Sequence, residues 1–371
     1  MRIERIELRS LVMPLRAGFE TSFGRVASRE MVIVALHADR LVGWGEAPVA
    51  DRPHYSPETA STAMDVLAHH MAPAIVGRGF ETPGQLLDAI AFVRGHHMAR
   101  AALEWAWWDL DAKRRGISLA AALGAERERV PVGVSLGIPA GDDLGALLAE
   151  VHRRVEQGYH RVKLKIRPGF SREPVAAVRE RWPELALCVD GNGGFRPEHT
   201  PELAALDPFD LLFIEQPLAH DDLLEHARLR RRIATPICLD ESLSSPAALD
   251  AALALGSLDV INLKSGRVGG VSAARSILRT ARERRVELWC GGMLETGIGR
   301  AAHVALAACP GFTQPGDLSA SERYYEEDLV EPAFTLDADG CLRVPDGPGI
   351  GVEVRGDRLE RATRRHLVIE P

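Results

Sequence analysis

The chain has few of the features that mark membrane, secreted and nucleic-acid-binding proteins. Its first residues, MRIERIEL, alternate charged and apolar side chains and lack the apolar core of a signal peptide. The longest apolar runs, such as residues 31–36, are too short to cross a bilayer. A formal net charge of −7 argues against a general affinity for nucleic acid or anionic lipid. The sequence therefore predicts a cytoplasmic protein that has neither nucleic acid nor membrane as a partner.

Cysteine is also scarce. The five cysteines form no CxxC pair, and several lie in apolar runs, so we expect free, buried thiols in a reducing compartment. No GxGxxG motif follows the first strand-like run, which argues against a dinucleotide-binding sheet. A length of 371 residues is too great for one small core and favours two domains.

The two ends of the chain differ in pattern from its middle. Residues 3–13 and 30–47 alternate as strands do, with Gly43 and Gly45 marking a tight connection, and the pattern is helical from residue 56 to residue 115. We therefore expect an α+β N-terminal capping domain over residues 1–125. In the tail, residues 326–371, Asp339-Gly340 is a hairpin signal, and we expect this tail to return and complete the capping domain.

Between these ends, residues 126–325 repeat a strand-then-helix pattern. Such repetition predicts right-handed βαβ units and a parallel sheet, and eight candidate strands favour a closed barrel. The predicted fold is therefore α/β, with a C-terminal (β/α)7β TIM-like barrel. The candidate strands are Val130–Leu136, Arg161–Ile166, Leu185–Val189, Leu211–Ile214, Ile237–Leu239, Val260–Leu263, Val286–Trp289 and, more weakly, Phe312–Gly316.

Charged residues end five successive strands at intervals of 24 or 25 residues, about the length of one βα unit. Each should therefore lie at the C-terminal end of its strand, the face where barrel active sites are built. A charge at the end of a buried strand is costly unless it is paired or binds a metal. The five residues are Lys165, Asp190, Glu215, Asp240 and Lys264.

Three of these residues are carboxylates on three successive strands. They would repel one another unless a cation lies between them, and oxygen ligands alone favour Mg²⁺, with Mn²⁺ as a substitute. The alternative is a salt-bridge network with the lysines, which we disfavour because three carboxylates outnumber the nearby cations. Lys163 and Lys165 alternate with Leu164 and share one face. A lysine near a metal and other cations should have a lowered pKa, which suits a base.

A divalent metal beside two lysines suits reactions that form an enolate. The metal holds a substrate carboxylate while a lysine removes the α-proton. The second lysine then either donates a proton to the opposite face, giving racemisation, or stays charged while a β-group leaves.

Five motifs surround these residues: KLKI (163–166), VDGN (189–192), FIEQPL (213–218), CLDES (238–242) and INLKSGRVGG (261–270). By these motifs the chain resembles the enolase superfamily, muconate-lactonizing subgroup, over nearly its full length. Three further stretches narrow the resemblance to the o-succinylbenzoate synthase/N-succinylamino acid racemase family. They are FETSFG (19–24), WCGGMLETGIGRA (289–301) and PGDLSASERYYEEDL (315–329).

The resemblance implies a role for each residue of the site. Lys165 would be the general acid/base, Lys163 would support the enolate and lower the pKa of Lys165, and Lys264 would be the second acid/base or a stabilising cation. Asp190, Glu215 and Asp240 would bind Mg²⁺, and Asn192 and Glu241 would order these ligands. Substrate would contact the loops that hold Phe19, Phe23 and Tyr55, together with Ser135, Gly291, Gly292 and Met293.

The family implies two reactions that the sequence does not separate. One is the syn-dehydration of a succinyl-bearing cyclohexadiene carboxylate, a step of menaquinone synthesis; the other is the racemisation of N-succinylamino acids. A dipeptide epimerase or muconate cycloisomerase fits the loop motifs less well. A metal hydrolase would need histidine ligands, and a non-catalytic binding protein would not keep all five residues. A homo-oligomer is expected by resemblance. The chain departs from the family at residues 191–194, where extra glycines are expected to loosen the loop near the metal.

Overall fold

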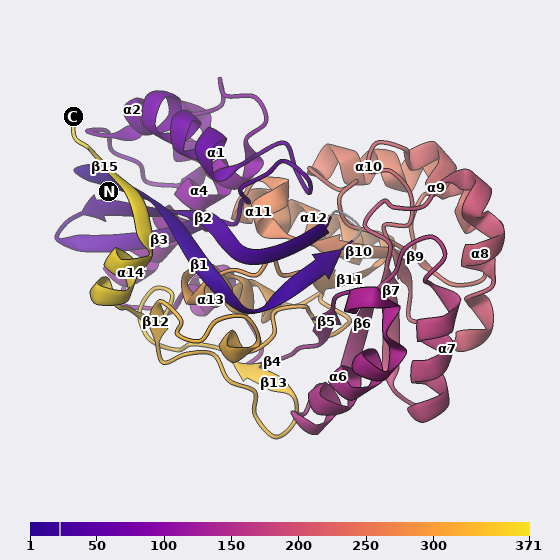
Figure 1. The fold of residues 1–371 in the computed structure, drawn as a ribbon. Helices are drawn as coiled ribbons and strands as arrows, with labels where there is room; N and C mark the ends of the chain where they lie inside the picture. The colour runs from indigo at the N-terminus through magenta and orange to yellow at the C-terminus, as the bar shows by residue number, and fades with distance from the viewer. Residues whose placement is uncertain (22–23) are drawn as a thin grey trace.

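The computed structural model describes residues 1–21 and 24–371. It has two parts that lie side by side (Figure 1): a sheet with helices, formed mostly by the first third of the chain, and a barrel formed by the middle. Both ends of the chain lie on the first part, where the last strand runs beside the first. We call this first part the capping domain.

A four-stranded antiparallel sheet in the order β15-β1-β2-β3 forms the base of the capping domain. The apolar face of this sheet packs against helices, chiefly the long helix α4, in a core separate from that of the barrel. The elements are β1 (Arg5–Thr21), β2 (Gly24–Ala38), β3 (Leu41–Ala47), α1 (Ala60–Val66), the π-helical turn η1 (Leu67–Met71), α2 (Ala72–Ile75), α3 (Pro83–Ala89), α4 (His97–Arg114) and α5 (Leu119–Leu123).

The prediction that Gly43 and Gly45 mark a tight connection is wrong. The turn between β2 and β3 lies at Asp39 and Arg40, whose φ values of 51° and 62° belong to the left-handed region that such turns require. Both glycines instead lie inside β3, where α4 crosses it. A Cβ on Gly45 would lie 2.0 Å from the backbone oxygen of α4 residue Ala102, so the glycines permit close packing.

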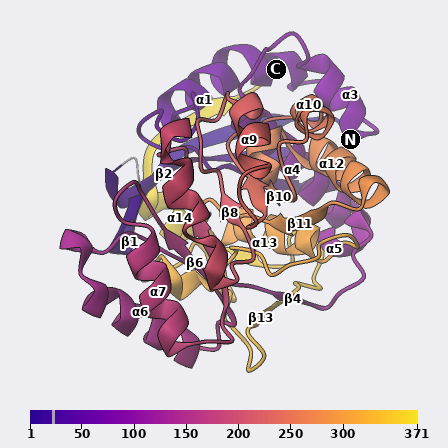
Figure 2. The ribbon, with the colours of Figure 1, turned by 90° about the vertical axis from the view of Figure 1, so that its right-hand side faces the viewer.

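Parallel strands in the order β11-β10-β9-β8-β7-β6-β5 form the barrel, with helices on its outside (Figure 2). The elements are β4 (Arg129–Pro131), β5 (Val134–Leu136), α6 (Leu144–Glu156), β6 (Arg161–Lys165), α7 (Arg172–Arg181), β7 (Ala186–Asp190), α8 (Thr200–Ala204), β8 (Ile214–Glu215), α9 (Leu223–Arg230), β9 (Ile237–Leu239), α10 (Pro246–Leu255), β10 (Val260–Leu263), α11 (Ser265–Val268), α12 (Val271–Arg284), β11 (Glu287–Cys290) and α13 (Gly297–Ala307). The predicted (β/α)7β barrel is confirmed.

Residues 313–317 take the eighth place in the barrel without forming a regular strand. Thr313 N donates to Leu288 O of β11 at 2.9 Å, and on the other side Gly133 N, beside β5, donates to Gly316 O at 2.7 Å. These bonds join the two edge strands of the seven-stranded sheet and close the barrel, which explains why this segment gave the weakest strand pattern.

An apolar layer fills the barrel below the strand ends. The rings of Phe213 and Trp289 stack at 5.7 Å with an interplanar angle of 16°. Two cysteines, Cys188 and Cys238, belong to the same buried cluster. Such a layer of side chains from several strands makes the barrel interior a packed core with no channel.

The tail contacts both parts of the molecule. Its last strand, β15 (Thr363–Ile369), pairs with β1 and completes the capping sheet, as predicted. The hairpin turn at Asp339-Gly340 is present, but β13 (Cys341–Arg343) pairs with β4, the short strand that precedes the first barrel strand. The remaining elements are β12 (Val330–Glu331), β14 (Glu353–Val354) and α14 (Gly356–Ala362). The domain limits at residues 125 and 325 stay predictions.

Two expectations from composition concern membrane spans and cysteine thiols. Within residues 1–21 and 24–371, no helix combines the length and the hydropathy that a membrane span needs. All five cysteines are free thiols; four are buried and Cys341 is partly exposed.

Candidate active site

The five charged residues of the strand ends lie together at the C-terminal end of the barrel. Parallel pairing sets Lys165 of β6 opposite Asp190 of β7, and Asp190 opposite Glu215 of β8. Asp240 follows β9 and Lys264 follows β10 directly. All five are buried, with at most 9% of each side chain exposed. The regular spacing along the sequence therefore translates into one layer of charge.

Each carboxylate of this layer accepts a hydrogen bond from a lysine. Lys165 Nζ donates to Asp190 Oδ2 at 2.6 Å, Lys163 Nζ to Glu215 Oε2 at 2.5 Å, and Lys264 Nζ to Asp240 Oδ2 at 2.8 Å. Arg267 also forms an ion pair with Asp240.

One expectation about these charges is wrong. Cations are not outnumbered, because Arg267 adds a fourth to the three lysines. The lowered pKa expected for a lysine beside a bound metal stays a prediction, and the protein groups alone raise the pKa of two lysines. Burial opposes the charged form of Lys163, but Asp317, Glu215 and Asp190 outweigh burial and hold its pKa well above the ordinary value. Burial likewise opposes the charge of Lys264, yet Tyr55 and Glu215 lead the groups that raise its pKa.

The carboxylates are turned towards these cations and do not converge on one point. Among the described residues, no group of three or more His, Cys, Asp or Glu side chains has the spacing to hold a metal ion as it stands. The set of donors nevertheless fits a hard divalent cation, because three carboxylates come from three neighbouring strand ends. A metal would replace the lysine contacts of these carboxylates.

Asn192 and Glu241 lie beside the carboxylates. Asn192 N donates to Asp190 Oδ1 at 2.8 Å, and its side-chain nitrogen donates to Glu241 Oε1 at 3.0 Å. The other oxygen of Glu241 is buried and accepts no hydrogen bond from the described residues. Burial and the nearby Asp190 raise the pKa of Glu241 to about 7. The unpartnered oxygen of Glu241 is a further observation that fits a bound cation.

Below this layer lies a buried network that the sequence analysis missed. Asp317 accepts from Arg161 at 2.5 Å and pairs with Lys163 at 2.6 Å, and both cations lie over the ring of Trp289. Strand alternation could have identified Arg161, because it shares the inward face of β6 with Lys163. It could also have identified Asn262, which lies two residues before Lys264 and donates to Glu215 Oε1 at 2.7 Å.

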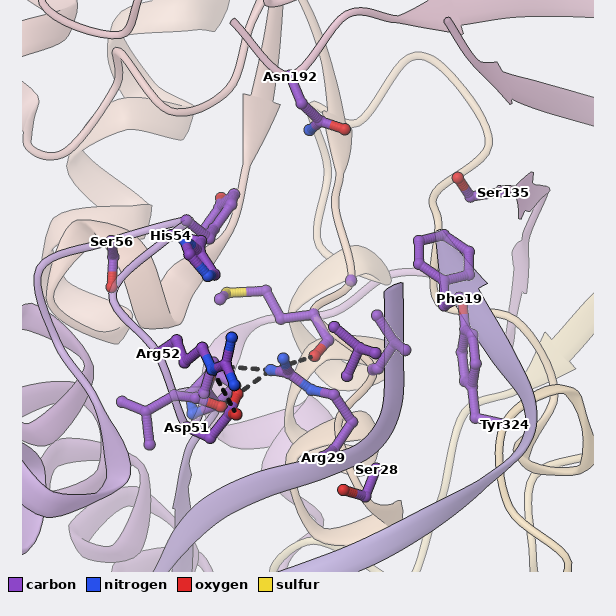
Figure 3. Close-up of a pocket in the computed structure, with 18 of the residues that line it drawn as sticks. Phe19, Ser28, Arg29, Asp51, Arg52, His54, Ser56, Ser135, Asn192 and Tyr324 are labelled. Carbon is purple, nitrogen blue, oxygen red and sulfur yellow. Dashed lines mark hydrogen bonds and ion pairs between the residues drawn. The ribbon is translucent and has the colours of Figure 1, made fainter. Parts of the chain in front are cut away.

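A cavity of about 360 Å³ opens above the charged layer, between the barrel and the capping domain. Lys163, Lys165 and Lys264 line its floor, while residues of β2 and of the segment 48–58 line its other walls. Figure 3 shows Phe19, Ser135 and Tyr324 grouped on one side of the cavity, with Asp51, Arg52 and His54 across from them. The cavity is large enough for a small carboxylate substrate.

The residues predicted to bind substrate lie on this cavity with two exceptions. Phe19, Tyr55, Ser135, Gly292 and Met293 line it. Gly291 instead packs against the stem of Lys264, where a Cβ would lie 2.8 Å from Lys264 Cε. Phe23 lies outside the described residues.

Tyr55 links the capping domain to the charged layer. Its hydroxyl donates to Asp240 Oδ1 at 2.9 Å and accepts from Lys264 at 3.1 Å and from Arg267 at 2.7 Å. Burial raises the pKa of Tyr55, so the hydroxyl keeps its proton at neutral pH. Tyr55 thus connects the Lys264 side of the site to the capping domain above it.

The glycines of the loop 191–194 are held by backbone hydrogen bonds. Gly193 N donates to Gln216 O at 2.7 Å, and Gly194 N donates to Gly191 O at 2.9 Å. Gly193 has a φ of 69°, a conformation that favours glycine. The loop is therefore fixed against β8 despite its composition.

Models of known protein families match most of the chain. A family model described as the mandelate racemase/muconate lactonizing enzyme N-terminal domain matches residues 5–124, and one described as enolase C-terminal domain-like matches residues 146–358. The chain belongs to the enolase superfamily. These matches cover both halves of the cavity wall, so this superfamily member has the capping domain as well as the barrel.

Individual relatives of this superfamily member are similar over nearly their full length. An N-succinylamino acid racemase from Amycolatopsis sp is 45% identical over 98% of each chain. An o-succinylbenzoate synthase from Bacillus subtilis is 42% identical over 97% of this chain and 96% of its own. The crystal structure of an enolase-superfamily protein from Listeria innocua superposes with a TM-score of 0.95 at 39% identity, over 100% of this chain and 99% of its own.

Proposed function

We propose that this protein is an o-succinylbenzoate synthase that also racemises N-succinylamino acids in the same site. The relatives named above carry one or the other of these two names at similar identity, which supports a site suited to both reactions. The observation that carries the proposal is the placement of the two lysines. With eight places around the barrel, β6 and β10 are four places apart, so Lys165 and Lys264 face each other across the cavity floor.

The proposal includes Mg²⁺, with Mn²⁺ as a substitute, held by Asp190, Glu215 and Asp240. When bound, the metal would hold the substrate carboxylate and offset the second negative charge that develops on it. Asn192 would keep Asp190 oriented through its backbone N–H. Lys163 would add positive charge from below, because three carboxylates keep it protonated despite its burial.

Lys165 and Lys264 then perform the proton transfers. In the dehydration, Lys165 Nζ takes the α-proton and returns it to the hydroxyl that leaves on the same face, so that water is released. Lys264 stays protonated during this reaction. In the racemisation, one lysine takes the α-proton and the other donates a proton to the opposite face. The cavity walls keep water away from the carbanion between these steps.

Substitution of each lysine separates these roles. We expect Lys165→Ala to lose both activities, by a factor of at least about 10² given the usual contribution of general acid–base catalysis. We expect Lys264→Ala to lose two-way racemisation. Both variants are assayed after circular dichroism has shown that they fold. Substantial turnover by Lys165→Ala would refute its role as the base, and two-way racemisation by Lys264→Ala would refute the two-lysine mechanism.

The assignment itself is tested with purified protein and Mg²⁺. Dehydration is followed by absorbance, and racemisation of N-succinylamino acids by polarimetry and by exchange of the α-proton in D₂O. A dipeptide substrate tests the epimerase alternative, and a muconate tests the cycloisomerase. Activity on neither succinyl substrate would contradict the proposal and leave the superfamily assignment unchanged.

The proposal also sets the cellular context. A dehydration of this kind would serve menaquinone synthesis, and the substrate is a small carboxylate that bears a succinyl group. Five free cysteines support a reducing compartment such as the cytoplasm. Both points would be tested in cells, by deleting the gene and measuring menaquinone, and by fractionation.

A further inference from the structure

The loop of residues 291–296, called the pocket loop below, runs from β11 to α13 and forms one wall of the cavity. It passes beside Lys264, because Gly291 packs against the stem of that lysine. Leu294 in this loop has a φ of 59°, which is unfavourable for a residue with a side chain. A loop in this conformation needs support from its surroundings, since strained backbone persists only where neighbouring structure holds it.

Side chains of Arg29 in the capping domain and of Tyr325 provide this support. Arg29 of β2 donates to Met293 O at 3.2 Å, and the Tyr325 hydroxyl donates to Leu294 O. Figure 3 shows the Arg29 side chain extending from its strand into the cavity region. These contacts hold the middle of the pocket loop by its backbone oxygens.

Glu46 of β3 holds the other end of the pocket loop. Its Oε1 accepts from Thr296 N at 3.1 Å, and its Oε2 accepts from the Thr296 hydroxyl at 2.6 Å and from Gly299 N at 3.0 Å. Thr296 is also the N-cap of α13. A Cβ on Gly299 would lie 2.9 Å from Glu46 Oε2, so the glycine leaves room for the carboxyl group.

Glu46 is a buried acid whose surroundings do not favour a charged carboxylate. Its side chain is 3% exposed, and within the described part of the chain no cation pairs with it. Burial of a carboxyl group without a cation is costly, and the N–H groups at the N-terminus of α13 offset only part of that cost. Burial, followed by the nearby Glu295, raises its pKa to about 8. The Glu46 carboxyl group therefore positions its hydrogen-bond partners, although its burial costs folding free energy.

We propose that Glu46 is a positioning residue, which fixes the pocket loop and thereby the environment of Lys264. The carboxyl group joins the capping domain to the junction of the pocket loop and α13. It thereby holds the capping domain and the loop beside Lys264 in a fixed relative position. Lys165, on β6 across the cavity, is outside the reach of this contact. This inference rests on the proposed racemisation, in which each enantiomer loses its proton to a different lysine.

The test compares the two enantiomers of N-succinylphenylalanine. The initial rate of α-proton exchange in D₂O is measured for each, and Lys264→Ala identifies the enantiomer that depends on Lys264. For Glu46→Gln we expect the Lys264-dependent rate to fall about tenfold relative to the other rate, because small displacements of a catalytic group cost this much or more. The amide nitrogen cannot accept the hydrogen bonds that a carboxyl oxygen accepts.

Asp109→Asn is the matched control. Asp109 of α4 is a buried carboxylate that accepts from Trp44 N at 2.7 Å, and Trp44 lies on β3, the strand that carries Glu46. Its other partners are Lys113 and Ile350 N, so it has no hydrogen bond to the pocket loop. This variant should lose stability and keep the wild-type ratio of the two rates. Thr296→Ser, which retains the hydroxyl, should also keep the ratio, whereas Thr296→Val should shift it in the same direction as Glu46→Gln.

Each outcome supports or contradicts the positioning role of Glu46. A ratio that is unchanged in Glu46→Gln, or shifted equally in Asp109→Asn, overturns the positioning role and leaves the proposed function standing. If Glu46→Gln does not fold, Thr296→Val decides by the same ratio. Wild-type protein that exchanges neither enantiomer overturns the racemase activity, and the positioning role with it.

Discussion

Buried carboxyl groups in this protein are compensated in two ways. At the strand ends, carboxylates such as Asp190 contact lysines, and the pKa of Asp190 is lowered by Lys165 and Lys163 despite burial. Glu46 and Glu104 instead face the N-termini of α13 and α12, where Glu104 accepts from Ser272 N at 2.9 Å. Burial raises the pKa of both. Carboxylates with a lowered pKa, such as Asp190, should therefore lose their stabilising effect as pH falls. Glu46 and Glu104, whose pKa is raised, should lose theirs as pH rises.

Glu46 should make the protein less stable as pH rises. Its pKa is about 8 in the folded protein against an ordinary 4.5, so the folded state keeps a proton that the unfolded state has lost between these values. The stabilisation is complete below the ordinary pKa and is lost as pH rises through the folded pKa. Relative to Glu46→Gln, the unfolding free energy of the wild type should fall by up to about 1.4 kcal/mol per pH unit.

Urea unfolding of both proteins between about pH 5 and about pH 9 measures this difference. Every other titratable group is present in both proteins, so the comparison isolates the effect of the Glu46 carboxyl group and its neighbours. Parallel stability curves for the two proteins would contradict a raised pKa at this position.

The contact between β3 and α4 depends on glycine. Gly45→Ala would place a Cβ 2.0 Å from Ala102 O, and the backbone of both elements would have to move. We expect a loss of about 1–3 kcal/mol in unfolding free energy, as for other overpacked cores. Gly84→Ala in α3 is the control, because its Cβ would meet no atom closer than 3.7 Å. It should be neutral or stabilise by up to about 1 kcal/mol. Equal effects of both substitutions in urea unfolding would refute the packing argument.

The elements that could be predicted from sequence are those with a regular period. Short apolar runs and the interval between them identified seven barrel strands and the position of Asp190, because a parallel barrel repeats one geometry. Arg267 and Asp317 were missed, since they lie on α11 and on the irregular segment 313–317, where neither pattern applies. The role of Gly45 was misread because a glycine in a strand and a glycine in a turn have the same local signature.

The site as a whole requires both parts of the molecule. The barrel supplies the charged layer, and the capping domain supplies Tyr55, which donates to Asp240 Oδ1, and Arg29, which holds Met293 O. The strand β15 completes the sheet that carries Arg29 on β2. Sequence patterns could not predict contacts of this kind, because they join positions more than 180 residues apart through side chains.

A divalent metal should stabilise the whole molecule, because its ligands come from three separate strands that the folded state alone brings together. The expected gain is about 2.7 kcal/mol at a hundredfold excess of Mg²⁺ over its Kd, seen as a rise in the thermal midpoint that a chelator reverses. Glu215→Gln removes a charged ligand and should abolish most of this rise.

Asp259→Asn is the matched control for the metal. Asp259 is a carboxylate at the opposite end of the barrel, where it pairs with Arg230 and accepts from Ile237 N at 3.0 Å. The variant should be less stable than the wild type at every Mg²⁺ concentration and yet show the full metal-dependent rise. If Glu215→Gln and the wild type gain equally from Mg²⁺, the metal binds elsewhere. That result would contradict the proposed role of Glu215 as a metal ligand.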